Sequence, residues 1–263
     1  MTKQIQSLAS LPIWECGLIM VLLAVGGATL VELIARRIIP HQLRRDHNTM
    51  SAAVFTVIGT TYAVLLAFVA MLAWGSYNHA EQVTDTEVSL IQNVYQLVDG
   101  LSGPEMAGMR ANIVAYAEAV VRTEWPAQEA GRVVGEDEPH LDELTTVALH
   151  LRPDNIADGD LHTLLLSDLT RLSSARRERL FAARTPIPEI LWVVLIDGGG
   201  ITVVFASLLG SSSLALHLAM SSLLAISGSL VLLVILALSN PYRGDLSISP
   251  QPFAQVTRHM ASP

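Results

Sequence analysis

The chain has 263 residues, of which 51% are hydrophobic, and its formal net charge at pH 7 is −8. A mean hydropathy of +0.45 excludes an ordinary water-soluble globular domain, whereas the charge requires a sizeable polar portion. The acidity is local. Residues 75–189 hold 9 Lys/Arg and 19 Asp/Glu, a net charge of −10, and the rest of the chain stands at +2. Such an acidic segment with few aromatic residues argues against nucleic acid as a partner.

Four apolar runs are each long enough to cross a hydrocarbon core of roughly 30 Å as a helix. Spans 13–34 and 52–74 form a first transmembrane hairpin, 13–74, and spans 190–209 and 214–238 form a second, 190–240. The first run is too long for a signal peptide, and its arginines follow it, so we interpret it as a retained anchor. Glu32 lies near its end, where the carboxylate is expected to reach the interface. The only cysteine, Cys16, lies in this run and excludes an intrachain disulfide.

Small residues recur at every fourth position in two of the spans. Gly59, Ala63 and Ala67 form one such face, and Gly198, Thr202, Ala206 and Gly210 form another. In lipid, such faces let helix backbones approach closely, so they indicate helix packing.

The segment 75–189 is predicted to be an all-helical extramembrane domain. Helical spacing continues past Tyr77, which predicts that the second span extends as one helix, and Trp125-Pro126 is expected to end a later helix. Met106 and Met109 are interpreted as core residues. A last helix, 160–183, is expected to turn leucines inward and its arginines, Arg176, Arg177 and Arg179, outward. Residues 241–263 are interpreted as a polar C-terminal tail. The predicted fold class is therefore all-α: a four-span helical membrane protein with an all-helical domain between spans two and three.

Four arginines mark the first short loop: Arg36, Arg37, Arg44 and Arg45. The positive-inside rule favours a cytoplasmic location for this loop in the cell inner (plasma) membrane, which leaves the 75–189 domain extracytoplasmic. The arginines that precede the third span argue for the opposite orientation. The same four loop residues are candidates for binding an anion or a lipid phosphate, with a pure topology signal as the alternative.

Asp197 is an acid inside an apolar span, where it is costly unless it pairs or faces water. It is a candidate for an ion path, with a hydrated position near the interface as the alternative. His217 opens the fourth span and is expected to cap it by hydrogen bonding. The acidic run 136–138 is interpreted as a solvated connector. We find no catalytic motif and no metal-ligand or cofactor pattern, so an enzyme is not expected.

Several segments together resemble the bacterial bestrophin-like family of unknown function. They are Arg44-Arg45-Asp46-His47-Asn48, Tyr62–Phe68, Glu124-Trp125-Pro126, Leu191–Leu195, Pro241–Asp245 and Ser249–Phe253. The resemblance covers nearly the whole chain. It implies a homo-oligomer, a pentamer in bestrophins proper, which are anion channels with a pore-lining second span. It also implies that the domain between spans two and three is cytoplasmic, opposite to the charge bias.

These observations lead to the hypothesis of a homo-oligomeric ion channel in the lipid bilayer, with inorganic ions as partners. The pore-lining candidates are the polar Thr56, Thr60, Thr61 and Ser76, with apolar constrictions at Leu66 or Val69. The acidic domain would attract cations, whereas the resemblance implies anions. The alternative is a non-conducting membrane scaffold or sensor whose acidic helical domain binds a partner.

Overall fold

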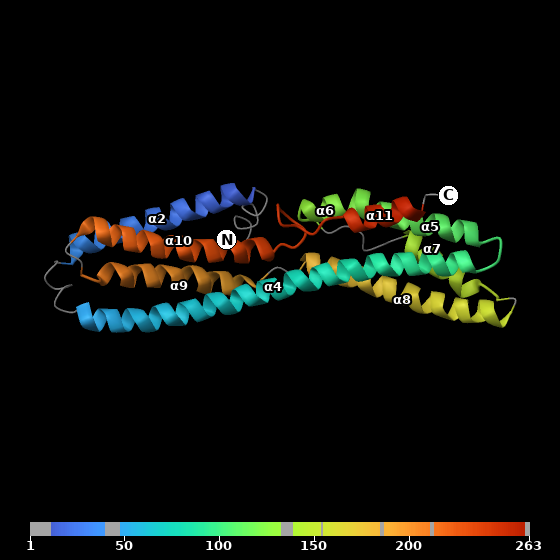
Figure 1. The fold of residues 1–263 in the computed structure, drawn as a ribbon, viewed down its shortest axis with the longest axis horizontal. Coiled ribbons are helices and arrows are strands. Elements are labelled where there is room, and N and C mark those ends of the chain that lie inside the picture. Colours follow the sequence, from blue (N-terminus) through green and yellow to red (C-terminus); the bar gives the residue numbers. More distant parts are fainter. Residues whose placement is uncertain are drawn as a thin grey trace. The chain divides into compact units, whose positions relative to one another are not determined.

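A computed structural model of the chain describes residues 12–39, 48–132, 139–153, 155–184, 187–210 and 213–260. Within these ranges every regular element is a helix and none is a strand (Figure 1), which confirms the predicted all-α fold class. The chain divides into two compact units. Unit 1 falls within residues 1–76 and 187–240, and unit 2 within residues 77–186 and 241–263.

Unit 1 consists of α2 (Ile13–Ile38), the first part of α4 (Asn48–Gly100), α9 (Glu189–Leu208) and α10 (Leu214–Leu238). Among the described residues, four helical stretches, each of which includes one of these helices, are long and apolar enough to cross a membrane. Helix α2 packs along α10, and α9 packs against both (Figure 1). The four spans expected from the sequence are thus helices, and α10 has the predicted ends.

Side-chain hydrogen bonds define the connection between α9 and α10. The Ser213 hydroxyl accepts from the Leu216 backbone N–H at 3.3 Å, which caps the first turn of α10. The Asn48 side chain accepts from the Gly210 backbone N–H at 3.1 Å and ties the start of α4 to this connection. His217, which is predicted to cap, does not do so, and its side chain instead lies 2.9 Å from the Glu32 carboxylate of α2.

Glycines let α4 and α9 approach closely. A Cβ at Gly198 would lie 2.7 Å from the Tyr62 ring, and a Cβ at Gly199 would lie 2.9 Å from the Tyr62 hydroxyl. That hydroxyl donates to the Leu195 carbonyl at 3.0 Å. The small-residue face that begins at Gly198 therefore includes a packing position, as its spacing indicates.

Helix α4 is continuous over 53 residues, as the helical spacing beyond Tyr77 predicts. It ends before Gly103, whose φ of +141° is rarely adopted by residues with a side chain. Its second part enters unit 2, together with α5 (Met106–Ala119), α7 (Pro139–His150) and α8 (Ile156–Arg184).

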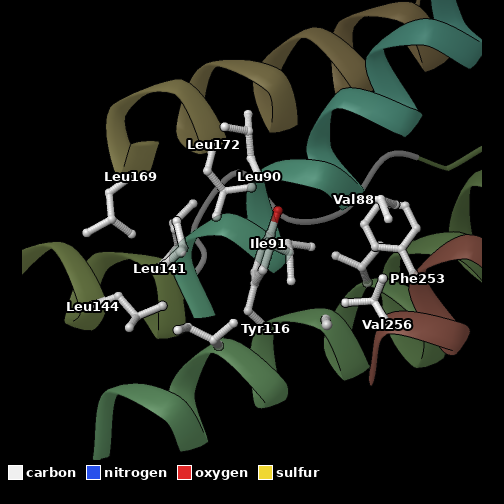
Figure 2. Packing of buried hydrophobic residues seen from close by; sticks show 14 of the residues in the cluster. Val88, Leu90, Ile91, Tyr116, Leu141, Leu144, Leu169, Leu172, Phe253 and Val256 are labelled. Carbon is white, nitrogen blue, oxygen red and sulfur yellow. The ribbon is translucent and has the colours of Figure 1, made fainter. Parts of the chain in front are cut away.

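The core of unit 2 is built from regularly spaced apolar residues of these helices (Figure 2). Met106 and Met109 are buried, which confirms their interpretation as core residues. The innermost members include Ile91 and Val94 of α4, Ile113 and Tyr116 of α5, Leu144 of α7, Leu165, Leu169 and Leu172 of α8, and Phe253 near the C-terminus.

The expected helix end at Trp125-Pro126 is wrong. After α5 the chain continues as the π-helix η1 (Val120–Glu124) and then as α6 (Trp125–Glu129). Pro126 follows directly on this π-helix, where the Trp125 N–H bonds the Val120 carbonyl five residues earlier, and the wide turn accommodates the proline ring.

The C-terminal segment, interpreted from the sequence as a polar tail, is part of unit 2. It folds into α11 (Gln251–Met260), and Tyr242, Phe253 and Val256 are buried in unit 2. The Tyr95 hydroxyl of α4 also donates to the Met260 carbonyl at 3.1 Å. The segment is polar in overall composition, but its few apolar residues fall on one helical face and complete the core.

Candidate functional site

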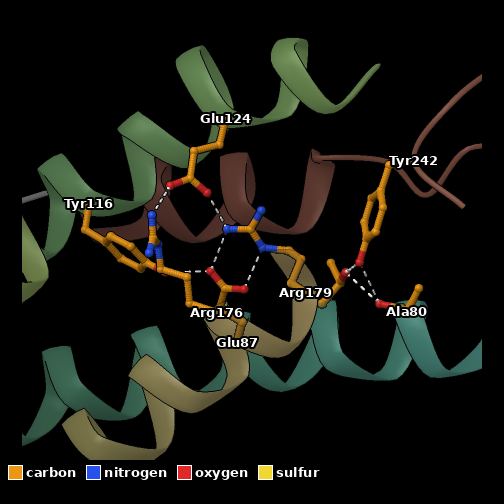
Figure 3. A network of polar contacts seen from close by, with 8 residues as sticks. Ala80, Glu87, Tyr116, Glu124, Arg176, Arg179 and Tyr242 are labelled. Carbon is orange, nitrogen blue, oxygen red and sulfur yellow. Dashed lines mark hydrogen bonds and ion pairs between the residues drawn. The ribbon is translucent and has the colours of Figure 1, made fainter. Parts of the chain in front are cut away.

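Four buried charged side chains from three helices form one ionic network in unit 2 (Figure 3). Arg179 of α8 binds both oxygens of Glu87 of α4, at 2.7 and 3.1 Å, and reaches Glu124 of η1 at 2.6 Å. Arg176, one turn earlier in α8, binds the other Glu124 oxygen at 2.7 Å. Because two carboxylates face two guanidinium groups, the network is neutral as a whole.

Tyr116 of α5 adds a neutral donor to this network. Its hydroxyl donates to Glu87 at 2.6 Å, so Glu87 joins α4, α5 and α8 (Figure 3). A buried ion pair needs good geometry and further hydrogen bonds to offset the loss of hydration. The two-pronged contact of Arg179 with Glu87 and the Tyr116 hydrogen bond supply these, while Arg179 Nη1 has no hydrogen-bond partner among the described residues. The outward orientation predicted for Arg176 and Arg179 is therefore wrong, since both face the core and only Arg177 is exposed.

The network perturbs the protonation of its members. Burial works to lower the pKa of Arg179, but the neighbouring charges of Glu87 and Glu124 raise that pKa well above its usual value. Burial, followed by the negative charge of Glu87, raises the pKa of Tyr116 well above its ordinary value. Arg179 thus stays charged and Tyr116 stays a proton donor, which keeps the network intact.

Aromatic rings of α6 and α11 pack against the guanidinium group of Arg179 in this network. The Arg179 guanidinium carbon lies 5.9 Å from the Trp125 ring centre and 5.8 Å from that of Phe253. Tyr242 meets Trp125 edge-on at 5.4 Å, and its hydroxyl bonds the Ala80 carbonyl and Thr84, each at 3.2 Å. Burial raises the pKa of Tyr242 to about 12.

Helix α4 presents an exposed face in unit 1. Thr56, Thr60 and Thr61 are exposed there, and Ser76 is exposed at the end of this part of the helix. The hydroxyls of Thr56 and Thr61 donate to carbonyls four residues earlier, each at 2.9 Å, so their oxygens keep lone pairs that can accept.

Apolar side chains on α4 divide into an exposed and a buried set. Val64, Phe68 and Met71 are 65%, 61% and 77% exposed and share one helical face. Leu66 and Val69, the two constriction candidates, are 8% and 0% exposed, and Leu66 lines a cavity inside unit 1. In this arrangement these two side chains face their own chain.

A further buried acid lies in unit 1. Glu32 of α2 is fully buried within the protein, and its carboxylate lies 2.6 Å from Arg36 Nε and 2.9 Å from His217 Nε2. The acid needs these partners because a buried charge without a partner is costly. The sequence places Arg36 one turn from Glu32, but only the packing of α10 on α2 brings His217 to it.

A family profile described as the Bestrophin-like domain matches residues 22–253, nearly the entire chain. The chain belongs to the Bestrophin-like family. No curated protein sequence matches this bestrophin-like protein significantly.

Solved structures support the same fold for this bestrophin-like chain. A variant of a bacterial bestrophin homologue from Klebsiella pneumoniae matches with a TM-score of 0.66 and 15% identity over 91% of this chain and 97% of that chain. A second structure of the Klebsiella homologue matches with a TM-score of 0.62 and 18% identity over 91% and 96%. A structure described as a membrane protein variant gives 0.66 and 16% over 91% and 97%. Together with the membrane-length helices, family and fold identify a multi-pass membrane protein of the bestrophin type.

Three of the segments that carry the bestrophin-like resemblance meet in the network of unit 2. Glu124 and Trp125 come from one segment, and Tyr242 and Phe253 come from the C-terminal ones. In this bestrophin-like protein these residues hold helices together, and the structure gives Glu124 and Trp125 a role that sequence reasoning did not assign.

The remaining candidates of the bestrophin-like chain are scattered. Asp197 is exposed on α9, where it borders a shallow apolar hollow with Phe205, and it is not part of either buried ionic group. Arg37 is exposed at the end of α2, whereas Arg36 pairs with Glu32. Arg44, Arg45 and the acidic run 136–138 lie outside the described residues. No group of three or more potential metal ligands occurs in the described ranges.

Proposed function

We propose that this bestrophin-like protein is a homo-oligomeric ion channel, a pentamer by analogy with its family, whose path is lined by α4. Membership in a family of ion channels supports the proposal and argues against an enzyme. The observation that carries it is the exposed face of α4 in unit 1, where three threonines fall within six residues of an apolar span. Exposed hydroxyls on a span are better solvated by water in a channel than by lipid.

The chemistry of this face suits conduction. The threonine oxygens of Thr56, Thr60 and Thr61 can accept from water or contact a cation, and Ser76 continues the polar positions. Val64 and Phe68 are the constriction candidates, in place of Leu66 and Val69, because they are exposed. A narrow apolar ring can gate a channel by excluding water.

Cysteine accessibility tests the assignment of this face. In a background with Cys16→Ala, water-soluble thiol reagents should modify Thr60→Cys and Phe68→Cys and reduce the current in planar bilayers. Leu66→Cys is the matched control, since it lies on the same helix but is buried in its own chain. Equal modification of all three positions, or no current from the parent protein in any salt, would overturn the proposal.

Ion selectivity is tested separately. The net charge of −10 in residues 75–189 favours cations near that domain, while the resemblance to anion-conducting bestrophins favours anions. The reversal potential in asymmetric KCl distinguishes the two, because its sign reports which ion carries the current. A non-conducting scaffold or sensor whose acidic domain binds a partner would instead give a monomer or dimer with no current.

We place the protein in the inner (plasma) membrane with the domain 75–189 extracytoplasmic, on the basis of the arginine-rich first loop. The family resemblance implies the opposite side. A reporter fused after Ser262 that is active only in the periplasm should be active, and a cytoplasm-specific reporter at the same position should be silent. The reverse pattern would place the domain in the cytoplasm.

A further inference from the structure

An apolar cavity of about 730 Å³ lies among the four membrane-spanning helices of unit 1, and all four contribute to its wall. Glycines keep it open. At Gly27, Gly59 and Gly228, from α2, α4 and α10, an added Cβ would meet no other atom within 4 Å. The space is thus large enough for an organic ligand, since ligand-binding cavities in proteins measure roughly 300–1,000 Å³.

The wall offers no free hydrogen-bond donor from a hydroxyl group. Each of its hydroxyl-bearing side chains already donates to a main-chain carbonyl. These are Tyr62, Thr202, Ser227 and Ser229, which donate to Leu195, Gly198, Leu224 and Ile226 at 3.0, 2.8, 3.4 and 2.9 Å. Buried water needs roughly two to four polar partners, and apolar cavities that lack them stay dry and bind apolar molecules. The chemistry of the wall therefore selects an apolar occupant.

The surroundings identify the source of that occupant. Because the wall belongs to helices that cross the membrane, the medium around it is lipid hydrocarbon. A phospholipid acyl chain is apolar, flexible and present there at high concentration. We propose that this cavity binds one acyl chain of an anionic phospholipid.

The negative headgroup is matched by charge at the end of α2. Val31 belongs to the wall, and Arg37 lies six residues further on, roughly 9 Å along the helix axis at about 1.5 Å per residue. The neighbouring Arg36 is held by Glu32 at 2.6 Å. Arg37 is exposed and pairs with no residue in the described part of the chain, so its charge is available to a lipid phosphate.

Photolabelling of the full chain in phosphatidylglycerol vesicles tests this site. The probe is a phosphatidylglycerol with a diazirine in one acyl chain, and mass spectrometry locates the carbene insertions. We expect insertion at Leu66, which lines the cavity but is only 8% exposed, so bulk lipid on the protein surface should label it little. Insertion confined to exposed residues such as Leu30 would overturn the proposal.

Substitutions that fill the cavity provide the second measurement. Gly27→Leu and Gly228→Leu, on different helices, should each lower insertion at Leu66 by at least about five-fold, because the new side chain takes the space of the acyl chain. Gly26→Leu is the matched control: it neighbours Gly27, its Cβ also meets no atom within 4 Å, and it is not part of the wall. An equal loss in all three variants would contradict the site.

The headgroup has its own variant. In the parent chain we expect the phosphatidylglycerol probe to label Leu66 at least about three-fold more than a phosphatidylcholine probe. Arg37→Gln should remove this preference. It should still allow insertion at Leu66 when either probe is used alone. A parent chain without such a preference would refute the anionic part of the proposal. Blocked insertion at Leu66 together with a crosslink between two copies at this position would show that a second chain fills the cavity instead.

Discussion

Both units bury a carboxylate on a helix, but they stabilise the buried positions in different ways. In unit 2, Glu87 and Glu124 are held by two arginines and a tyrosine drawn from α5 and α8, so the charges connect several helices. In unit 1, Glu32 finds one partner on its own helix and one on α10, and contact between α4 and α9 depends on glycines against Tyr62. Unit 2 should therefore be most sensitive to loss of charge, and unit 1 to added volume.

The largest effect is expected from Arg179→Met in unit 2. Removing this guanidinium leaves Glu87 buried with Tyr116 as its remaining bonded side chain in the network, and breaking a buried ion pair in this way costs about 3–5 kcal/mol. Denaturant unfolding of the full chain in micelles, combined with hydrogen exchange of α8, measures the loss. Arg177→Met is the control: the residue is exposed and bonds Ser174 of its own helix, so a change within about 0.5 kcal/mol is expected. Equal losses in both variants would remove the contrast between the units.

A smaller effect is expected from Gly198→Ala in unit 1. The new methyl group would lie 2.7 Å from the Tyr62 ring, so the ring must move and its bond to the Leu195 carbonyl must lengthen. Overpacking of this kind costs about 1–3 kcal/mol, measured as denaturant unfolding in micelles. Gly200→Ala, two residues away with no atom within 4 Å of the new Cβ, should be neutral or slightly stabilising. If Tyr62→Ala does not relieve the cost of Gly198→Ala, the contact with Tyr62 is not its cause.

The smallest effect concerns pH and unit 2. The pKa of Tyr242 is raised to about 12 by burial, from an ordinary value of 10.0. Because the folded pKa exceeds the unfolded one, this stabilisation is fully present below the unfolded pKa and is lost as the pH rises through the folded one. The loss from this group should reach about 1 kcal/mol by pH 11.

Tyr242→Phe should remove that part of the alkaline loss, although it lowers stability at neutral pH by about 1 kcal/mol through its missing hydrogen bonds. Unfolding curves of both proteins at pH 8 and pH 11 give the comparison. Tyr116, whose pKa is also raised, remains in both proteins and cancels in the difference. Parallel losses of stability in both proteins would mean that Tyr242 does not titrate in this range.

The burial of Arg176 and Arg179 could have been predicted from the spacing of residues along α8. Leu165, Leu169 and Leu172 of α8 are spaced by four and three residues, and Arg176 and Arg179 continue that spacing. On α4, Glu87 falls on the stripe of Ala80, Thr84, Ile91 and Val94 in the same way. A charge in register with an apolar stripe is a signal for a buried partner, and here the register outweighs the usual preference of arginine for solvent.

Other features carried no signal in the sequence. Glu124 is the last residue of the π-helix η1, whose wider turn changes which side chains share a face, and nothing in the local composition indicates a π-helix. The contact of His217 with Glu32 joins residues 185 positions apart and depends on how α10 packs on α2. The apolar residues of 241–260 are too few to indicate burial by themselves. They are buried because residues of α5 and α6 pack against them.

The sequence by itself determined the helical class, the four spans and the continuity of α4, because length, hydropathy and helical spacing are local properties read over one or a few turns. The order of its short motifs along the chain also indicated the resemblance to the bestrophin-like family. Only the tertiary structure decided which charges are buried together, which face of α4 is left open and where glycines from three helices leave a cavity. Those features depend on the relative rotation and approach of helices distant in sequence, which side-chain packing sets and no single segment encodes.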